Sequence, residues 1–373
     1  MLVKTDSSGS SEGLQRLLKR MAGYDGVESL MVLACDRNGF TPAQIDPILQ
    51  SLKLPLFGGI FPALLFSGQK LELGTIVIGL PVPTQVHLVN GLSSQEDFDD
   101  CLDAGAPAFI DAKTMFVFVD AFARCIGAFI DSLFNVFGLE LNYLGGGAGS
   151  MTMVSKPCLM TNNGLVADAA VLAGLDAHSG VGVSHGWESI KGPYKVTEAQ
   201  HNCIKTLDWQ PAFDVYRQVV ETHSGRCFDA HPFFDLAKAF PFGITKMEAE
   251  RVVRDPCMAG QNGELICVGE LAEGAFVDIL HGNAGTLIQA AESAFWQSAE
   301  SYPLNRDRSL TFFIDCISRI LFLEDRFKDE IAAVSRHAKT MAGICSIGEI
   351  ASSGNDYLEF YNKTAVVGHI GIE

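Results

Sequence analysis

One histidine lies in a run of small and apolar residues, where its imidazole could bind a metal or a cofactor. Residues 180–187 read Gly-Val-Gly-Val-Ser-His-Gly-Trp. Alternation along a strand places His185 on the same face as two valines, and we expect Gly186 to leave open space beside the ring. A neutral imidazole in an apolar, roomy site is what an axial haem ligand requires. The commoner outcome of such a pattern is a histidine bonded to a backbone carbonyl, with Trp187 in the core.

A second group of possible metal ligands follows further along the chain. His223, Cys227 and His231 recur every four residues, which is the spacing of zinc ligands on one face of a helix. Gly225 within the group and Pro232 after it argue against a regular helix. Zinc is therefore a possible cofactor and not the favoured one.

An arginine and a glutamate near the C-terminus could bind a charged ligand or each other. Arg319 follows Asp315-Cys316-Ile317-Ser318, where a strand is expected to pass into a helix. Its guanidinium could hold a carboxylate through two hydrogen bonds, from a ligand or from Glu349, and a structural Arg–Glu pair is the simpler alternative. No Ser-His-Asp, Cys-His-Asn, G-x-S-x-G, H-E-x-x-H or P-loop pattern is present. We predict that the protein is not an enzyme.

A glycine-rich run at 145–149 resembles a nucleotide-binding loop only superficially. Such a loop must lead straight into a helix, whereas residues 151–157 end in Lys-Pro and favour an extended chain. Gly145, Gly146 and Gly147 are therefore expected to let two backbones approach closely, or to line a ligand cavity.

The order of the predicted elements repeats along the chain. A strand, a helix, a glycine turn and two strands are predicted three times, over Leu30–Leu80, Phe116–Leu175 and Leu310–Val367. The distance from the first strand to the glycines is 28 positions, then 29, then 31. We predict an α/β fold of the mixed α+β kind, with two lobes of mixed β-sheets covered by helices and built from these β-α-β-β units. The alternative is a chance recurrence of a common order.

A polar stretch near Gly192-Pro193 suggests the domain boundary. It divides the chain into one domain over residues 1–192 and a second over residues 193–373. Ligand sites favour domain interfaces. We therefore expect a cavity between the lobes, lined by the run 145–149, Trp187 and Arg319, with Glu349 close to Arg319.

Composition and charge limit the possible partners and compartment. The chain has 373 residues, of which 48% are hydrophobic, and 27 Lys and Arg against 44 Asp and Glu give a net charge of −17. This charge argues against nucleic acid and anionic membrane surfaces as partners. The N-terminus lacks a signal peptide, no apolar run is long enough to span a bilayer, and the ten cysteines form no CxxC pair. We expect a cytoplasmic protein.

Several of these segments, in their order along one chain, resemble the FIST family. They are Phe57-Gly58-Gly59, the run 145–149, Gly182–Trp187, Phe313–Arg319, and Gly348-Glu349-Ile350 followed by Tyr361-Asn362-Lys363-Thr364. The resemblance implies a FIST-N domain followed by a FIST-C domain. It also implies sensing of small ligands, amino acids among them, with a signal passed to kinases, cyclic-di-GMP enzymes or chemoreceptors.

Within that family, the stretch Cys316–Leu323 resembles the NosP branch of haem-binding nitric oxide sensors. This resemblance implies a b-type haem on a histidine. We expect His185 as the iron ligand and Arg319 beside a propionate, with His178, His281 and His369 as alternatives. The chain would then be a stand-alone sensor that reports nitric oxide to a separate histidine kinase or cyclic-di-GMP pathway. An amino-acid-like ligand without haem, or a zinc or thiol redox sensor, remain the alternatives.

Overall fold

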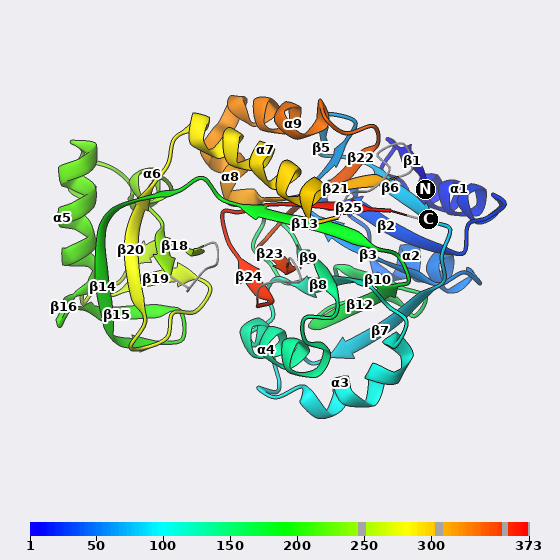
Figure 1. Ribbon diagram of the computed structural model, residues 1–373, viewed down its shortest axis with the longest axis horizontal. Helices are drawn as coiled ribbons and strands as arrows, with labels where there is room; N and C mark the ends of the chain where they lie inside the picture. The colour runs from blue at the N-terminus through cyan, green and yellow to red at the C-terminus, as the bar shows by residue number, and fades with distance from the viewer. Residues whose placement is uncertain (245–250, 303–308, 353–356, 372–373) are drawn as a thin grey trace.

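The computed structural model describes residues 1–244, 251–302, 309–352 and 357–371, and it has two parts (Figure 1). The larger part, here called the body, contains three six-stranded β-sheets. The smaller part, at the left of Figure 1, is formed by residues 188–282. Both parts combine strands with helices, so the predicted mixed α+β class is confirmed.

The three sheets of the body are mixed and are assembled from distant parts of the chain. The first has the strand order β1 (Leu2–Asp6), β6 (Thr75–Leu80), β2 (Ser29–Cys35), β3 (Leu56–Phe61), β10 (Leu159–Thr161) and β11 (Gly164–Val166). The second has the order β24 (Glu359–Tyr361), β23 (Glu349–Ser352), β9 (Asn142–Ala148), β8 (Thr114–Asp120), β12 (Ala169–Leu175) and β7 (Thr84–Asn90). The third has the order β13 (Ser179–Ser184), β25 (Ala365–Ile370), β21 (Leu310–Cys316), β22 (Met341–Ser346), β4 (Ala63–Phe66) and β5 (Gln69–Leu71).

The repeat predicted from the sequence is confirmed, and it occurs three times. The first central strand of each repeat is parallel to the strand after its helix and antiparallel to the last strand: β2 with β3 and β6, β8 with β9 and β12, and β21 with β22 and β25. An edge strand then pairs with that last strand, β1 with β6, β7 with β12 and β13 with β25. The three copies therefore share one strand order.

The glycines that mark each repeat lie in strands, and not in turns as the sequence predicted. Each is opposite a residue of the parallel neighbour at the same register position: Gly58 opposite Val32, Gly145 opposite Val117 and Gly343 opposite Phe313. A Cβ atom at these glycines would lie 1.8, 1.7 and 1.8 Å from the carbonyl oxygen of the opposite residue. Only glycine allows so close an approach, which explains why the spacing recurs.

Each repeat also contributes a hairpin to a neighbouring sheet. The hairpin β4–β5 follows β3 but pairs with β22, β10–β11 follows β9 but pairs with β3, and β23–β24 follows β22 but pairs with β9. The exchange is cyclic. Every sheet of the body therefore contains strands from two repeats.

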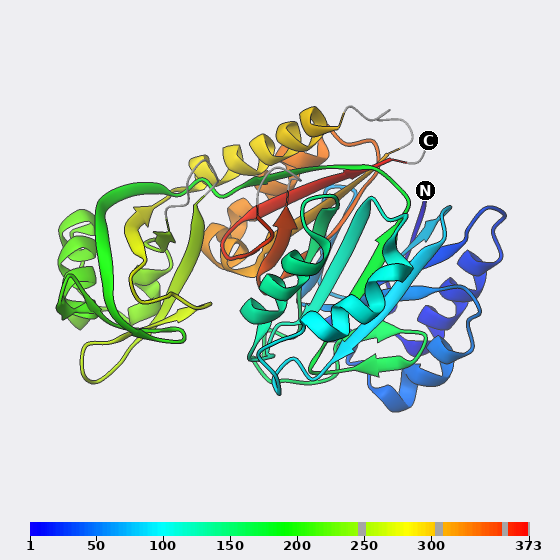
Figure 2. The same cartoon turned by 60° about the horizontal axis from the view of Figure 1, so that its bottom comes forward.

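Helices cover the outer faces of the sheets, and the inner faces meet in one core (Figures 1 and 2). The first sheet carries α1 (Ser11–Ala22) and α2 (Pro42–Gln50), the second α3 (Asp99–Gly105) and α4 (Ile126–Phe137), and the third α7 (Ala284–Ser301), α8 (Ile317–Leu323) and α9 (Phe327–Ser335). In the core, the ring of Phe116 lies 5.8 Å from that of Phe57 and 5.2 Å from that of Phe312, one ring from each sheet. The body is therefore one packed unit.

The helix expected to follow the strand at Asp315 is divided into two in the structure. Helix α8 ends at Leu323, and α9 begins at Phe327. Glu324 between them has a left-handed φ of 50°, which an α-helix cannot accommodate. The division turns α9 back toward α8, so that side chains from both helices can meet.

The smaller part is a closed β-barrel, here called the inserted barrel. Its strands are β14 (Glu188–Gln200), β20 (Phe276–His281), β17 (Phe242–Ile244), β18 (Val252–Ala259), β19 (Leu265–Val268), β15 (Cys203–Leu207) and the short β16 (Gln210–Pro211). Pairing of β14 with β15 closes the sheet, and α5 (Ala212–Ser224) and α6 (Phe233–Ala237) pack on it. Among the described residues, no helix is both long and apolar enough to cross a membrane.

The inserted barrel occupies one connection of the third repeat. The edge strand and the following helix are joined by residues 7–10 in the first repeat and by residues 91–98 in the second. In the third repeat, residues 185–283 join β13 to α7, and the barrel lies within them. The predicted boundary at residues 192 and 193 falls inside β14.

Candidate functional site

The run 180–187 packs tightly against helix α7. A Cβ atom at Gly180, Gly182 or Gly186 would lie 1.9, 2.0 or 2.4 Å from a carbonyl oxygen of that helix. The glycines therefore allow α7 to lie directly on β13 and the loop after it. The expectation of open space beside Gly186 is wrong, because α7 fills that space. Strand alternation predicts which face a residue lies on, but it does not predict what packs against that face.

His185 is buried and is held by the residue two positions later. Its side chain is 4% exposed, and Nδ1 accepts a hydrogen bond of 2.9 Å from the backbone N–H of Trp187. Burial lowers the pKa of His185 to about 3, with further lowering by Arg319 and Arg251. The ring is therefore neutral, and because Nδ1 accepts a hydrogen bond, the proton lies on Nε2.

This tautomer does not fit haem ligation by His185. A histidine that binds iron through Nε2 needs a lone pair on that atom and carries its proton on Nδ1. In this structure Nδ1 is the acceptor, so iron binding through Nε2 would require loss of the bond from Trp187. The three alternative histidines all contact other side chains: His178 stacks on Tyr302, His281 packs against Phe240, and His369 hydrogen-bonds with Ser298. Haem binding by any of these stays a prediction.

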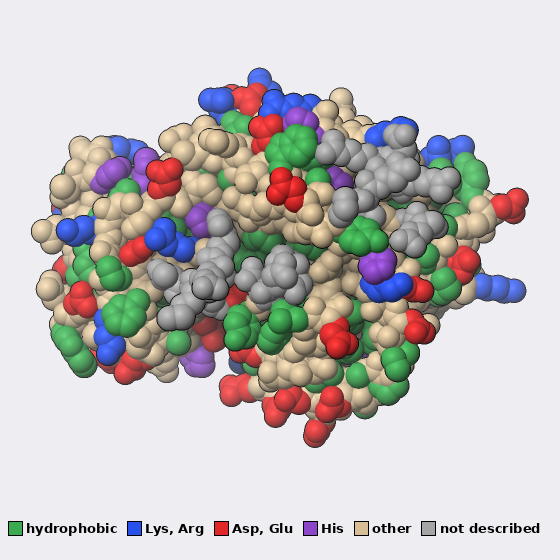
Figure 3. Space-filling view, in the orientation of Figure 1, with side chains coloured by type: hydrophobic (Ala, Val, Ile, Leu, Met, Phe, Trp, Pro, Cys, Tyr) green, Lys and Arg blue, Asp and Glu red, His purple; other side chains and the backbone are tan. Residues whose placement is uncertain are grey.

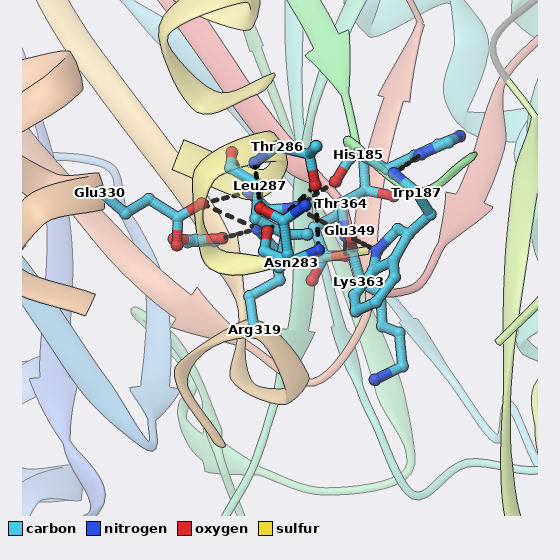
Figure 4. Close-up of polar contacts among 11 residues, drawn as sticks. His185, Trp187, Asn283, Thr286, Leu287, Arg319, Glu330, Glu349, Lys363 and Thr364 are labelled. Atoms are coloured by element: carbon cyan, nitrogen blue, oxygen red, sulfur yellow. Dashed lines mark hydrogen bonds and ion pairs between the residues drawn. The ribbon is translucent and has the colours of Figure 1, made fainter. Parts of the chain in front are cut away.

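Arg319 is the centre of a buried polar cluster (Figure 4). Its side chain is fully buried, and its Nε and Nη2 atoms contact the carboxyl groups of Asp315 and Glu330. Its other contacts are backbone carbonyls in three distant segments, 2.6 Å to His185 O, 3.2 Å to Lys363 O and 2.9 Å to Leu287 O. All five N–H groups of the guanidinium therefore donate within the chain, two to Glu330 Oε1 and three to backbone carbonyls, and Arg319 ties α8 to α7, α9 and two loops.

Glu349 belongs to the same cluster but pairs with neutral groups. Its carboxyl group accepts hydrogen bonds of 2.7 Å from Ser346 Oγ and 3.3 Å from the backbone N–H of Thr364. Burial raises the pKa of Glu349 to about 8, so the group is protonated at neutral pH. The ion pairs of Arg319 are with Asp315 and Glu330, in place of the pair with Glu349 that the sequence suggested.

Lys363 joins this cluster to the inserted barrel. It is fully buried, and its Nζ atom lies 3.1 Å from Asp255 Oδ2 and donates a hydrogen bond of 2.9 Å to Lys238 O, both in the barrel. The ammonium group also lies 5.0 Å from the centre of the Trp187 ring, whose Nε1–H donates to Lys363 O at 3.1 Å. Asp255, Asp315, Arg319, Glu330, Glu349, Lys363 and Trp187 are called the junction from here on.

Four buried carboxyl groups and two buried cations meet in the junction. Burial and the neighbouring Glu330 raise the pKa of Asp315 well above its usual value, and burial raises that of Asp255 although Lys363 opposes it. Burial therefore disfavours the ionised form of three of these four carboxyl groups, Asp255, Asp315 and Glu349. Strongly perturbed carboxyl groups of this kind are more frequent at functional sites than elsewhere.

The glycine run 145–149 lies in β9 and beside the turn that leads into β23. A Cβ atom at Gly147 would lie 2.2 Å from Ile347 O, and one at Gly146 would lie 2.7 Å from Gly348 O. Of the two roles expected for these glycines, close approach of two backbones therefore describes their surroundings. They place Glu349, the first residue of β23, at the edge of the junction.

The possible zinc ligands do not share a helix. Helix α5 ends at Ser224, and Gly225 has a left-handed φ of 69°. Cys227 and His231 follow in an irregular segment, so the four-residue spacing does not place them on one face with His223. Among the described residues, no group of three or more His, Cys, Asp or Glu side chains is placed to hold a metal ion.

Three members of the junction received no role from the sequence. Asp255 and Glu330 lie in no motif, and Lys363 lies in the run Tyr361–Thr364 that supports the family resemblance, but its partner Asp255 is distant in the chain. The only local signal is at Lys363, which directly precedes the strand-forming run Ala365–Ile370 together with Asn362 and Thr364. Three polar residues with less than 3% exposure before a buried strand indicate a structured corner.

Two known protein-family models match the chain. Residues 30–210 match the family model of the FIST N domain, and residues 212–352 match that of the FIST C domain. The two matches lie side by side and together cover most of the chain. No curated protein matches it.

Proposed function

Because the chain belongs to the FIST family, whose domains are sensory domains for small ligands in signal transduction, we propose that its ligand is sensed at the junction. The signal would pass to a separate signalling protein, with a histidine kinase or a cyclic-di-GMP enzyme as the partners that the family resemblance suggests. The binding event and the response would then involve the same place, where the inserted barrel meets the body.

One observation carries this proposal, the ion pair between Lys363 of the body and Asp255 of the barrel. Both side chains are almost fully buried, although each belongs to a different part of the molecule. Ligand sites are frequent at such interfaces. The surface is indented where the two parts meet (Figure 3).

The junction favours a ligand with an ammonium group, such as an amino-acid-like metabolite. Asp255 Oδ1 and Asn362 Oδ1 are buried acceptors that receive no hydrogen bond among the described residues. A buried acceptor without a donor is costly, and an ammonium group would supply three donors. The N–H groups of Arg319 are already matched by acceptors of the chain, which argues against this residue as the partner of a haem propionate.

Thermal unfolding with added ligands tests the proposal. Protein expressed with ample haem supply is first examined for a Soret band and then heated with a panel of amino acids and amines. An amino-acid-like ligand at about 100 times its Kd should stabilise the folded protein by about 2.7 kcal/mol and raise Tm. Asp255→Asn should abolish that rise.

His185→Asn separates the haem alternative from the amino-acid one. The shorter side chain keeps an oxygen near the Nδ1 position for the N–H of Trp187, but it has no atom in place of Nε2. A Soret band in the wild type that is lost in this variant would show that His185 binds haem and would overturn the present assignment. Colourless protein with an intact amino-acid response supports it.

A further inference from the structure

The three repeats share a corner residue just before the last strand. The strand residue opposite each repeat glycine also pairs with a residue of the last strand, and the corner residue lies four positions before that partner. The three corner residues are Leu73, Asp168 and Lys363. Asp168 and Lys363 both have a left-handed backbone, with φ of 49° and 54°. The second and third repeats therefore share this left-handed corner, and the three repeats differ in the side chain placed at this position.

In the first two repeats this side chain contacts the connection between the edge strand and the next helix. Leu73 packs against Gly9 in the connection 7–10, where a Cβ atom would lie 2.7 Å from Leu73 Cδ1. Asp168 Oδ1 accepts a hydrogen bond of 2.8 Å from the N–H of Ser93, in the connection 91–98. The corner residue thus fixes its own connection to the body.

In the third repeat the connection contains the inserted barrel, and the corner residue is Lys363. Its ammonium group contacts Asp255 and Lys238, both deep in that connection. Other polar contacts between the described parts of barrel and body include the 3.1 Å hydrogen bond from Arg254 Nη1 to Phe360 O, a hydrogen bond between Asp255 and Ser318 of α8, and the pair of Lys238 with Glu324, whose side chain is 71% exposed. The buried charge of Lys363 is therefore the central polar contact of this interface.

We propose that Lys363 is a latch, the contact that holds the inserted barrel against the body, and that the sensor has a second state in which this contact is broken. The barrel would then move on the two segments that connect it to the body, residues 185–187 and 281–283. The existence of the latch does not depend on the proposed function, whereas its use in signalling rests on it.

The chemistry of the junction supplies a way to release the latch. A buried ion pair gains little net stability, because both charges lose their water. An ammonium group of a ligand that binds Asp255 would replace Lys363 Nζ, and the open state would then bind this ligand more tightly than the closed one. Such a difference in affinity is what shifts a population between two states.

Hydrogen exchange of the ligand-free protein tests the latch directly. We expect Lys363→Met to speed exchange about tenfold or more at amides of residues 185–189, 281–283 and 360–364, while β2 and β8 in the body keep wild-type rates. Lys205→Met is the matched control, because Lys205 forms an exposed pair with Glu198 on the same barrel. Wild-type exchange at the connecting segments in Lys363→Met would overturn the proposal.

A second variant decides the case if Lys363→Met fails to fold. Lys363→Met combined with Asp255→Asn removes both charges and leaves no ion unpaired, so the same local increase in exchange is expected. Wild-type rates in this double variant would refute the latch. Faster exchange without any stabilising ligand in the panel would leave the latch established and the proposed function refuted, so the two failures are distinguishable.

Discussion

The second and third repeats share their strand order but differ in the connection between the edge strand and the next helix, which the corner residue contacts. In the second repeat, residues 91–98 make this connection, and Asp168 holds it through one hydrogen bond to Ser93. In the third, residues 185–283 make it, and seven side chains of the junction surround it. The same scaffold thus supports a short loop or a whole barrel at one position.

The second and third corners differ in the number of buried charged side chains around them. This difference indicates that the second corner has only a structural role. At the second corner, the buried Asp120 accepts hydrogen bonds from the backbone N–H groups of Phe122 and Asp168. Both of these donors are neutral groups. At the third corner, Arg319 and Lys363 are fully buried with four carboxyl groups. Burial of this many charges exceeds what the fold requires, since the second repeat forms without them.

Loss of Arg319 should have the largest effect. Arg319→Met leaves Asp315 and Glu330 buried without their cation, and we expect a loss of about 5 kcal/mol in the free energy of unfolding, or insoluble protein. Arg124→Met, at the second corner, removes an exposed arginine and should cost less than about 1 kcal/mol. Urea unfolding measures both, and equal effects would remove the distinction between the corners.

The protonated Glu349 should make stability depend on pH. Its pKa is about 8 in the folded protein and near 4.5 in the unfolded chain, so the folded state binds the extra proton between these values. The free energy of unfolding should therefore fall by about 3–5 kcal/mol between pH 4.5 and pH 9 through this group, and Glu349→Gln should flatten that part of the curve.

Glu72→Gln is the control for this pH dependence. The pKa of Glu72 is lowered by Lys70 and Arg37, so its contribution lies at acid pH. Urea unfolding curves at several pH values compare the two variants with the wild type. Curves for Glu349→Gln and wild type that stay parallel from pH 4.5 to pH 9 would show that this carboxyl group is ionised in the folded protein.

A repeat glycine should be equally indispensable in both repeats. Gly145→Ala and Gly343→Ala each place a methyl group within 2 Å of a carbonyl oxygen in the parallel strand, and we expect each to cost about 3 kcal/mol. Gly127→Ala in α4, with nothing within 4 Å of its new methyl group, should instead stabilise by about 0.5–1 kcal/mol. Thermal unfolding ranks the three, and a neutral Gly343→Ala would show that the third repeat is more tolerant.

The smallest effect is expected at the corner residue of the second repeat. Asp168→Ala loses the acceptor for Ser93 and a residue suited to left-handed backbone, at a cost of about 1 kcal/mol. Asp168→Asn keeps both properties and should stay within about 0.5 kcal/mol of the wild type. Hydrogen exchange at residues 91–95 should rise only in the alanine variant, and a loss comparable to that of Lys363→Met would contradict the comparison.

The repeats were predictable from the sequence because their signal is local. Gly58, Gly145 and Gly343 recur at similar distances from a strand, and the parallel pairing that requires them is set within each unit. The capping box of Thr41 and Gln44 at the start of α2 is a signal of the same local kind. The break of the long helix at Glu324 has no such signal, because it depends on how α9 packs.

The junction could not be predicted from the sequence because its contacts join segments that are far apart in the chain. Arg319 was expected to bind a ligand carboxylate or to pair with Glu349, but three of its five hydrogen bonds go to backbone carbonyls far away in the chain. His185 was identified as a possible ligand, and only the packing of α7 shows that the space beside it is filled. The exchange of hairpins is equally non-local, since it pairs strands that are a hundred residues or more apart in the chain.

The cyclic exchange of hairpins has a consequence for how this protein folds. The first sheet is complete only when β10–β11 of the second repeat pairs with it. The second sheet likewise requires β23–β24 of the third repeat, and the third sheet requires β4–β5 of the first repeat. Most of its strand pairing is therefore between residues far apart in the chain, a topology that folds slowly. No repeat can complete its sheet alone, and a cut at residue 211, between the two family matches, would leave unpaired strand edges on both fragments. We expect each fragment to aggregate when expressed singly and the two to assemble when refolded together.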